Sequence, residues 1–355
     1  MRQKTKTKSV KKTAQNEPKP ANDAKRPNTR TSTHSEYDIA IIGGGVVGFA
    51  AAMYAGRFRM KTILFGDKMG GVIITTDVVE NYPGFKRLTG QELADKVREH
   101  AMDYEVEMEE ELVKDIGKQE RNDAKSVNAP VFKVTTESGK VINAKTVLFA
   151  TGTKWKKLGV PGEEQFANKG VHYCALCDGS FFKNKIIGLV GGSDSAAKDA
   201  LVLTQYGKKV YIIYRGDQIH PEPVNMERVQ QKIKEGKIEI INNTNVKEIK
   251  GDKFVKSVLL DKPYKGKNEF PLDALFVAIG HIPLSDLAVK LGVKVDNKNE
   301  IIIDRTSSTN MPGIYAAGDV VDTKFKQAIT GVGEAVSAVY SAYTYIGEQG
   351  TKKKK

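Results

Sequence analysis

Apolar positions in this chain gather in short runs, and glycine-rich turns directly follow two of these runs. The first run, residues 37–42, has the continuous apolar pattern of a buried parallel strand. The turn Gly43-Gly44-Gly45-Val46-Val47-Gly48 follows it, and small residues at 49–55 then predict a closely packed helix. Another apolar run at 62–65 completes the order strand, glycine turn, helix, strand. This order predicts the start of an α/β dinucleotide-binding fold of the Rossmann type.

The glycines of this turn have separate roles in such a fold. Gly43 permits a tight turn, Gly45 lets backbone amides approach a pyrophosphate, and Gly48 lets the helix pack closely on the strand. The pyrophosphate then lies at the helix N-terminus, where unpaired N–H groups favour negative charge. Asp67 comes 24 residues after Gly43, near the place where an acid accepts a ribose hydroxyl. The context of strand, helix and acid therefore predicts a dinucleotide site.

A second unit of the same kind lies further along the chain. Residues 185–190 predict another apolar strand, and Gly191-Gly192-Ser193-Asp194-Ser195 forms the turn after it. A helix through Leu203 and a strand at 210–214 follow in the same order as in the first unit. Such an internal duplication predicts two Rossmann-like domains in one chain.

Two similar strand ends indicate that the second unit is inserted into the first. An apolar strand at 147–152 ends in Thr-Gly, and residues 277–280 end in Ile-Gly, as is typical where backbone approaches a ligand closely. We expect crossovers near residues 153 and 283. The predicted organisation comprises a basic disordered tail, a discontinuous first domain, an inserted second domain and a short basic tail: 1–36, then 37–153 with 284–349, then 154–283, then 350–355.

The remaining pattern predicts further parts of the first domain. Residues 90–107 have the character of an exposed charged helix, and 131–142 that of a strand pair around a polar turn. A strand at 313–319 ends in Gly-Asp, where the carboxylate of Asp319 can accept a ribityl hydroxyl. A helix of small residues at 327–345 would then direct its N-terminal amides towards the carboxyl end of the sheet.

The chain contains only two cysteines, Cys174 and Cys177, and Asp178 follows them directly. Two thiols three positions apart can close a small disulfide ring, and exchange requires one of them as a thiolate near neutral pH. In a compartment that keeps thiols reduced, this pair indicates redox catalysis more than a structural bridge. A metal site that includes His172, and cysteines without chemical function, are the alternatives; structural zinc usually has four protein ligands.

Charge is concentrated at the two ends of the chain. The formal net charge is +13, yet residues 1–36 alone hold ten Lys or Arg side chains against three acids, and residues 352–355 are all Lys. The first 36 residues lack large apolar side chains, which predicts a disordered tail with at most weak contact to polyanions. No apolar run approaches the roughly 18 residues of a membrane span, so we expect a cytoplasmic protein.

At this point the motifs resemble those of one family, the bacterial-type low-molecular-weight thioredoxin reductases, which are FAD-dependent pyridine nucleotide-disulfide oxidoreductases. The resemblance covers residues 37–347 and leaves out only the tails. The matching blocks are Gly43 to Gly48, Gly70-Gly71 with Thr75-Thr76, Glu80-Asn81-Tyr82-Pro83-Gly84, Ala150-Thr151-Gly152, Cys174 to Gly179, and Gly318-Asp319-Val320 with Lys326-Gln327-Ala328-Ile329-Thr330.

The resemblance implies a homodimeric flavoprotein that passes electrons from NAD(P)H through FAD to the Cys174–Cys177 disulfide and on to thioredoxin. It places Cys177 nearer the flavin, assigns the attack on the partner disulfide to Cys174, and makes Asp178 the acid that handles the thiol proton. It also implies that the inserted domain rotates relative to the flavin domain about the two crossovers. Residues assigned to FAD are Gly43, Gly45, Gly48, Asp67, Gly71, Thr76, Asn81, Thr151, Gly152, Gly318, Asp319, Lys326, Gln327, Ala328 and Ile329. Those assigned to the pyridine nucleotide are Gly191, Gly192, Ser193, Asp194, Ser195 and Arg215.

The second nucleotide site departs from the family pattern. Ser193 replaces a glycine and could crowd the pyrophosphate, Lys198 stands where an acid is usual, and the 2′-phosphate cluster retains Arg215 but has lost two arginines. Three interpretations follow: NADPH binding shared by Arg215, Lys198 and His220, a preference for NADH, or a degenerate site with another donor such as reduced ferredoxin.

Two alternatives to a thioredoxin-disulfide reductase stay open. The same scaffold could reduce another protein disulfide partner, since nothing in the sequence selects the partner. A more distant alternative is a flavin- or nucleotide-binding module whose basic tails anchor it to nucleic acid, although the restriction of charge to the tails favours only an accessory role for such contact.

Overall fold

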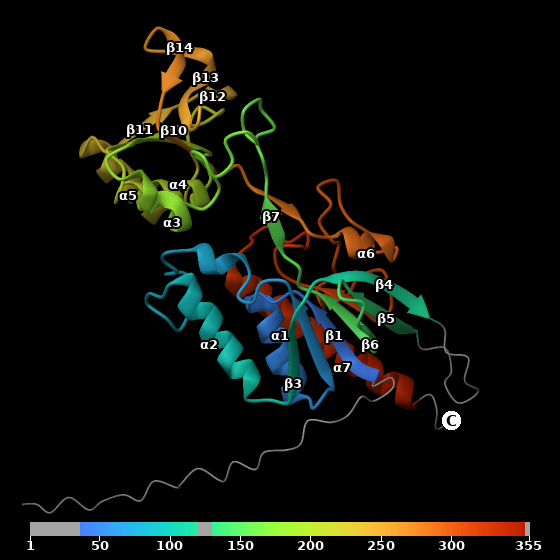
Figure 1. Cartoon of the computed structure of the whole chain (residues 1–355). Helices are drawn as coiled ribbons and strands as arrows, with labels where there is room; N and C mark the ends of the chain where they lie inside the picture. Colours follow the sequence, from blue (N-terminus) through green and yellow to red (C-terminus); the bar gives the residue numbers. More distant parts are fainter. Residues whose placement is uncertain (1–35, 120–129, 352–355) are drawn as a thin grey trace, which may run out of the picture. The chain divides into compact units, whose positions relative to one another are not determined.

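The computed structural model describes residues 36–119 and 130–351 of the chain, and side chains as far as residue 349. Apart from Glu36, the predicted N-terminal tail lies outside the described residues, as do residues 352–355. Two parallel sheets organise the rest, each with helices packed on it (Figure 1).

The first sheet contains strands from both ends of the described chain. Its order is β3-β2-β1-β6-β5-β4, and β17 pairs with β6 from the C-terminal part. β1, β2, β3, β6 and β17 run parallel, whereas β4 and β5 are antiparallel additions. The strands span β1 Glu36–Ile42, β2 Thr62–Gly66, β3 Val106–Glu110, β4 Val113–Gln119, β5 Val131–Thr136, β6 Val141–Phe149 and β17 Ile314–Ala316.

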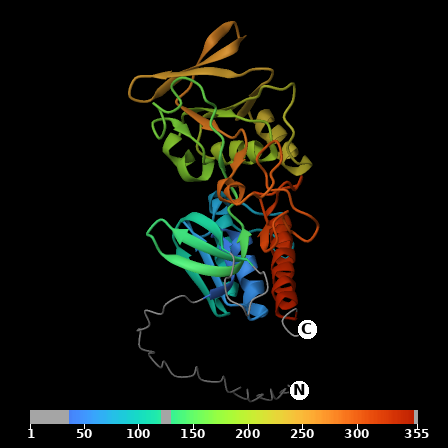
Figure 2. The ribbon, with the colours of Figure 1, turned by 90° about the vertical axis from the view of Figure 1, so that its right-hand side faces the viewer.

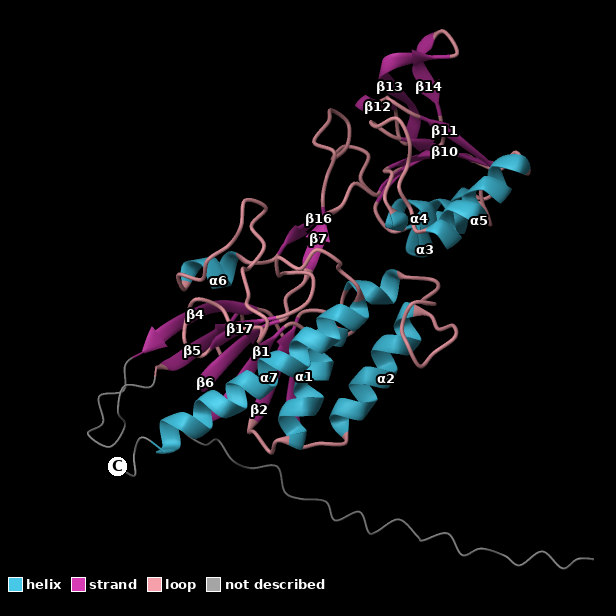
Figure 3. Cartoon of the chain, turned by 180° about the vertical axis from the view of Figure 1, so that it is seen from behind, coloured by secondary structure: helices cyan, strands magenta, loops and turns pink. Residues whose placement is uncertain are grey.

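Helices cover this sheet because their inner faces carry small residues. Ala50, Ala51 and Ala55 of α1 and Ala338 and Ala342 of α7 are fully or almost fully buried in one apolar cluster with β1 and β2. Figure 3 shows α1, α2 and α7 along the same face of the sheet, and Figure 2 shows α7 running beside α1. The helices span α1 Val46–Arg57, η1 Val72–Thr75, α2 Gly90–Met102, α6 Asp286–Lys290 and α7 Ala328–Thr351.

The second sheet is formed by the middle of the chain and is parallel throughout, in the order β11-β10-β9-β15-β8. Its strands span β8 Val171–His172, β9 Ile186–Val190, β10 Lys209–Ile213, β11 Ile238–Ile241 and β15 Ala274–Val277. The helices of this part are α3 Ala175–Asp178, η2 Gly179–Phe182, α4 Asp194–Leu203 and α5 Pro223–Lys234. A separate antiparallel sheet consists of β12 Val246–Gly251, β13 Val255–Tyr264 and β14 Lys267–Pro271.

Two short strands carry the chain between the two parallel sheets. β7, Thr153–Trp155, follows the first sheet, and β16, His281–Pro283, returns from the second. They pair antiparallel, with Thr153 opposite Pro283 (Figure 3). The crossovers expected near residues 153 and 283 therefore lie in one two-stranded ribbon.

Several boundaries differ from the sequence-based prediction. The helix predicted over 90–107 ends at Met102, and Val106 already belongs to β3, where it pairs with Thr62 of β2. The helix is also not simply exposed, because Leu93 and Ala94 are buried. The separate strands predicted at 141–142 and 147–152 are one continuous strand, β6, and the C-terminal helix is longer than expected.

Within the described ranges, no helix is both long and apolar enough to cross a membrane.

Candidate functional site

The glycine turn between β1 and α1 is the tightest part of the first site. The Gly43 amide donates to the Phe65 carbonyl at 2.7 Å, and a Cβ at Gly43 would lie 2.1 Å from the Ala150 carbonyl oxygen. A Cβ at Gly48 would lie 1.9 Å from the Gly43 carbonyl oxygen. Close approach of backbone on both sides thus excludes any side chain at these positions.

Gly45 and Gly152, also predicted for this site, have more room. A Cβ at Gly152 would meet nothing within 4 Å, and at Gly45 it would only touch the backbone of Gly70 and Gly71 at 3.7–3.9 Å. Gly45 and Gly70 form an isolated parallel bridge, which brings the second glycine turn to the first. Space beside exposed backbone amides at the start of α1 is what a pyrophosphate needs.

Residues far apart in the sequence meet at the same edge of the first sheet. The Asn81 side-chain amide donates to the Gln327 side-chain oxygen at 2.8 Å, across 246 positions of the chain. A Cβ at Gly318 would lie 3.0 Å from Val47, so the Gly-Asp turn lies against the first turn of α1. Thr151 donates its hydroxyl proton to the Leu284 carbonyl at 2.7 Å, which ties the end of β6 to the returning segment.

Lys326, also predicted for the cofactor, contacts the Gly-Asp turn in the described structure. Its ammonium group donates to the carbonyls of Asp319 and Val321 and pairs with Glu300 at 3.2 Å. Lys326 therefore stabilises the Gly-Asp turn, while the side chain of Asp319 remains exposed. Glu334, which the sequence did not single out, accepts from the Gly318 amide at 2.8 Å and fixes the same turn.

The remaining residues predicted for FAD surround this edge without direct contacts to one another in the described structure. Asp67 is exposed just after β2, the Thr76 carbonyl accepts from the Gly90 amide, and Ala328 and Ile329 begin α7. Open space beside Gly45 and Gly152, the start of α1 and the exposed Asp319 side chain lie at this edge. These features fit an elongated dinucleotide such as FAD.

The second site repeats this arrangement, and its first two glycines also have close neighbours. Gly191 has a φ of +155°, and a Cβ there would lie 2.3 Å from the Ala278 carbonyl oxygen. A Cβ at Gly192 would lie 2.4 Å from the ring of Tyr214. Ser193 is the N-cap of α4, and its hydroxyl accepts from the Ala196 amide at 3.4 Å. The serine that replaces a glycine thus caps the helix whose N-terminus would face the phosphates.

Charged groups of the second site are partly committed to each other. The Asp194 carboxylate accepts from the Glu222 amide and the Asn225 side chain, both at 2.8 Å, and pairs with Lys198 at 2.8 Å. The His220 amide donates to the Gly192 carbonyl at 2.7 Å, so His220 lies beside the glycine turn. Arg215 and Ser195 are exposed. These positions fit a pyridine nucleotide and leave Arg215 as the cation at the end of β10.

The helix of the second site also carries an acid with unusual titration. Burial raises the pKa of Asp199 on α4 to about 7. Its folded pKa is therefore above its unfolded value, so the folded state keeps a proton that the unfolded state loses. The contribution of Asp199 to the free energy of unfolding therefore falls as the pH rises from about 4 to about 7 and is then level.

We expect Asp199→Asn to remove this pH dependence and to stabilise the protein above pH 7, by an amount on the order of a few kcal/mol, because one pKa unit corresponds to about 1.4 kcal/mol. Melting temperatures of both proteins between pH 4 and 8 measure it. Asp103→Asn, at an exposed position after α2, is the matched control. Parallel curves for wild type and Asp199→Asn would contradict the assignment.

Cys174 and Cys177 form a disulfide at the start of the second sheet's first helix, with their Cα atoms 5.4 Å apart. Cys174 is the N-cap of α3 and is 8% exposed, whereas Cys177 on the helix is exposed. The Asp178 carboxylate lies 2.8 Å from Nδ1 of His172. The sequence analysis considered His172 only as a possible metal ligand beside the cysteines. In the structure its imidazole contacts the Asp178 carboxylate.

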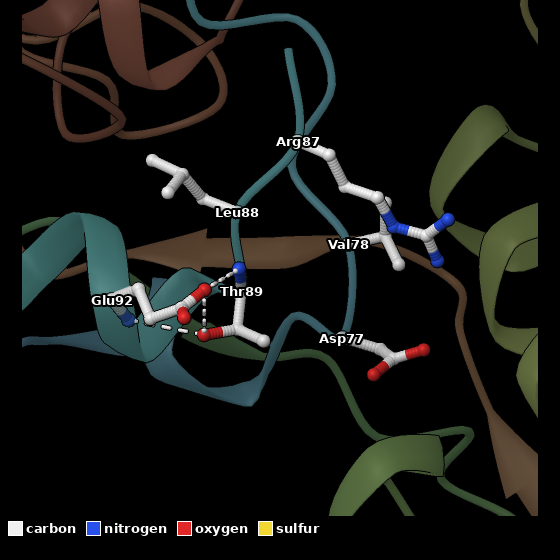
Figure 4. A pocket seen from close by; sticks show the side chains of 6 residues that line it. All are labelled: Asp77, Val78, Arg87, Leu88, Thr89 and Glu92. Carbon is white, nitrogen blue, oxygen red and sulfur yellow. Dashed lines mark hydrogen bonds between the residues drawn. The ribbon is translucent and has the colours of Figure 1, made fainter. Parts of the chain in front are cut away.

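The first domain also contains a recess. It has a volume of about 310 Å³ and is lined by Asp77, Val78, Arg87, Leu88, Thr89 and Glu92 (Figure 4). Glu92 is already used: its carboxylate accepts from the Thr89 amide at 2.7 Å and completes a capping box for α2. Its lining includes none of the residues predicted to bind a cofactor.

Comparison with known proteins identifies the family of the chain. The family model described as pyridine nucleotide-disulphide oxidoreductase matches residues 37–335. The chain belongs to the pyridine nucleotide-disulphide oxidoreductase family.

Its relatives narrow the class further. A thioredoxin reductase from Listeria innocua is 36% identical over 88% of this chain and 94% of its own length. A bifunctional thioredoxin reductase/thioredoxin from Mycobacterium leprae is 35% identical over 92% of this chain and 69% of its own length. The crystal structure of Lactococcus lactis thioredoxin reductase in its FR conformation superposes with a TM-score of 0.80, at 37% identity over 88% of this chain and 99% of that chain. Within the family, this chain groups with the thioredoxin reductases as an FAD-dependent disulfide oxidoreductase that uses a pyridine nucleotide.

Proposed function

We propose that the chain is a thioredoxin-disulfide reductase. The observation that carries the proposal is the Cys174–Cys177 disulfide, which occupies the domain of the second nucleotide site and has Asp178 beside it. A relative that joins thioredoxin reductase and thioredoxin in one chain supports thioredoxin as the substrate.

In this proposal the two nucleotide sites divide the work. Gly43, Gly45 and the N-terminus of α1 would hold the pyrophosphate of FAD, with Gly318-Asp319 at its ribityl part. Gly191, Gly192 and the N-terminus of α4 would hold the nucleotide, with Arg215 at the adenosine end. Bound flavin supplies the two electrons that the disulfide accepts. The predicted domain limits, 37–153 with 284–349 and 154–283, belong to the same proposal.

The ribbon of β7 and β16 would serve as the hinge between these domains. It contains both segments that connect the two parallel sheets, and its strands pair over only three residue positions. Rotation about so short a connection would let either the nucleotide or the disulfide face the flavin.

The disulfide exchange itself requires only side chains of this chain and the partner. One reduced sulfur attacks the partner disulfide as a thiolate, a mixed disulfide forms, and the partner's leaving thiolate takes a proton. The second sulfur then attacks the first, which restores the Cys174–Cys177 bond and releases the reduced partner. Asp178, next to Cys177, is placed to donate and recover the proton.

Turnover with a thioredoxin from the same source, coupled to insulin reduction, tests the proposal. We expect sustained oxidation of the nucleotide only when both thioredoxin and insulin are present. If the chain reduces a peroxiredoxin-like or glutaredoxin-like protein efficiently and does not reduce thioredoxin, that protein and not thioredoxin is the substrate.

The electron donor is a separate prediction. With Lys198 paired to Asp194, Arg215 remains the main cation for a 2′-phosphate, so we expect NADPH to keep at most a modest advantage over NADH, within about tenfold. Anaerobic flavin bleaching by each nucleotide, followed by stopped-flow absorbance, measures the ratio. Arg215→Gln should lower the NADPH rate and spare the NADH rate. Failure of both nucleotides would favour another donor such as reduced ferredoxin.

We also propose a cytoplasmic homodimer, as the family resemblance implies. Phe58 stacks on Tyr343 at 4.9 Å, and Tyr340 and Tyr343 are 60% and 48% exposed on α7. Such an exposed aromatic group suits a second copy of the chain better than water. Weak polyanion contact by the basic tails is an accessory part of the proposal. Sedimentation of the holoenzyme with and without residues 1–35 would test both.

A further inference from the structure

The residue that most directly contacts the proposed proton donor is a histidine outside the cysteine motif. His172 ends the two-residue strand β8, and β8 pairs with β15 so that His172 lies opposite Phe276. Two residues later Cys174 caps α3, and the helix returns Asp178 to the imidazole, with Nδ1 and Oδ2 2.8 Å apart. Strand pairing and helix geometry therefore fix this contact independently.

The surroundings of His172 hold its ring in one place. The imidazole stacks on Phe276 at 5.5 Å between centroids and meets the edge of Phe182 at 5.2 Å. Its side chain is 7% exposed, whereas that of Asp178 is 29% exposed. One member of the pair is buried between aromatic rings, and the other reaches solvent next to Cys177. Of the two side chains, the carboxylate is therefore the one that offers a proton the more open route to solvent.

A single carboxylate in this place would be a poor proton donor. An ordinary aspartate is ionised at neutral pH and has no proton to give, whereas imidazole changes charge between about pH 5 and 8. A histidine in hydrogen-bond contact adds a second group that can carry a proton beside the carboxylate.

The neighbouring elements carry few competing charges. β15 and η2 have no titratable side chain. The helix α4, which packs on α3, contributes Asp194 and Lys198, which pair with each other, and Asp199, whose pKa burial raises to about 7. The contact of His172 with Asp178 is therefore the close ionisable contact that the described structure records for this imidazole.

We propose that His172 is a positioning residue for Asp178 and stores the proton that Asp178 gives to the leaving thiolate of the partner. The inference rests on the proposed disulfide reductase function. During exchange, the reduced chain holds a thiolate, a thiol and the protonated pair. The pair protonates the first leaving thiolate of the partner, takes the proton of the second cysteine as that sulfur attacks, and passes it to the second leaving thiolate. Both partner sulfurs gain one proton, the intrachain disulfide re-forms, and the pair regains its proton from water.

The test compares substitutions of His172 that separate its hydrogen bond to Asp178 from its ability to hold a proton. His172→Asn keeps an N–H donor near the place of Nδ1 but cannot hold a proton, and His172→Phe keeps the aromatic stack without a hydrogen bond. We expect both to lower turnover with thioredoxin about tenfold at pH 8, less than the roughly 10²-fold or more of a general acid itself, because Asp178 is retained. For His172→Asn, the fall of turnover with rising pH should move at least about one unit towards acid. Nucleotide-driven flavin bleaching should stay unchanged, because that step does not use the pair.

His100→Asn, on the exposed face of α2, is the matched control and should behave like wild type. Asp178→Asn with and without His172→Asn completes a double-mutant cycle, in which the second change should cost nothing further if His172 acts through Asp178. His172→Gln replaces His172→Asn should the latter fail to retain FAD.

A wild-type pH profile in His172→Asn, or additive losses in the cycle, would overturn the role of His172. Absence of thioredoxin and small-disulfide turnover in the wild type would instead refute the proposed function itself.

Discussion

Cys177→Ser is expected to keep bound, yellow FAD and to lose thioredoxin turnover by about 10³-fold or more, because exchange needs two sulfurs that can bond to each other. The substitution removes one atom of the disulfide and lies at an exposed position of α3, so folding should be little affected. Steady-state reduction of thioredoxin, with flavin absorbance as the measure of folded holoenzyme, gives the result. Cys174→Ser should lose turnover equally.

The two serine variants differ in a second respect that tests the order of attack. The family resemblance assigns the attack on the partner to Cys174, yet Cys174 is 8% exposed and Cys177 is exposed. If Cys174 attacks, Cys177→Ser should form a stable mixed disulfide with a thioredoxin that lacks its resolving cysteine and carries a thionitrobenzoate disulfide on the remaining one, with release of thionitrobenzoate, and Cys174→Ser should not. The opposite pattern would reassign the attacking sulfur to Cys177.

Ser180→Ala provides the matched control for this pair, since Ser180 is exposed on η2 only three positions from Cys177. It should retain wild-type turnover and trap nothing. Turnover by Cys177→Ser within a few fold of wild type would contradict the redox role of the disulfide altogether.

Local features of the sequence predicted most of the elements that form the two proposed nucleotide sites. The turn from Gly43 to Gly48 needs close backbone approach, and only glycine permits it, so the residue type reports the geometry directly. The same holds for Gly191 in the second unit. The disulfide could also be predicted from the sequence, because Cys174 and Cys177 lie only three positions apart.

Features that depend on which strands pair in the folded chain could not be predicted from the local sequence. The charged run around Val106 has the composition of a helix, but its backbone joins the edge of the first sheet beside β2, and Tyr37 donates to Glu107 there. His172 meets Asp178 because β8 is held beside β15 while α3 returns Asp178 to the imidazole. Pairing partners of this kind are chosen by the packed sheet, which overrides local propensity.

The contacts of the Lys326 side chain could likewise not be predicted from the sequence. Its position in a family motif predicted a cofactor contact, and the sequence contains no sign of its bonds to the carbonyls of Asp319 and Val321. Glu334 binds the Gly318 amide from the next helix, sixteen positions away. In the described structure Lys326 and Glu334 thus stabilise the turn that would bind the flavin. Substitution of either residue should affect cofactor binding through a change in this turn.

Gly48→Ala is expected to destabilise the protein by about 1–3 kcal/mol and to weaken FAD binding at least about tenfold. In an ordinary helix alanine would be the better residue, but here its Cβ would lie 1.9 Å from the Gly43 carbonyl oxygen. The backbone of the glycine turn must therefore move away from α1. That movement displaces the amides that would bind the pyrophosphate. Urea denaturation of the apoprotein and FAD titration measure the two effects separately.

Gly347→Ala is the matched control, because Gly347 also lies within a helix, α7, and a Cβ there meets nothing within 4 Å. It should leave FAD affinity unchanged and raise stability by about 0.5–1 kcal/mol through helix propensity alone. Equal behaviour of the two variants would show that helix propensity, and not the approach of α1 to the turn, decides the effect at Gly48. Lost stability with unchanged FAD affinity in Gly48→Ala would instead separate the fold of this turn from the pyrophosphate site proposed on it.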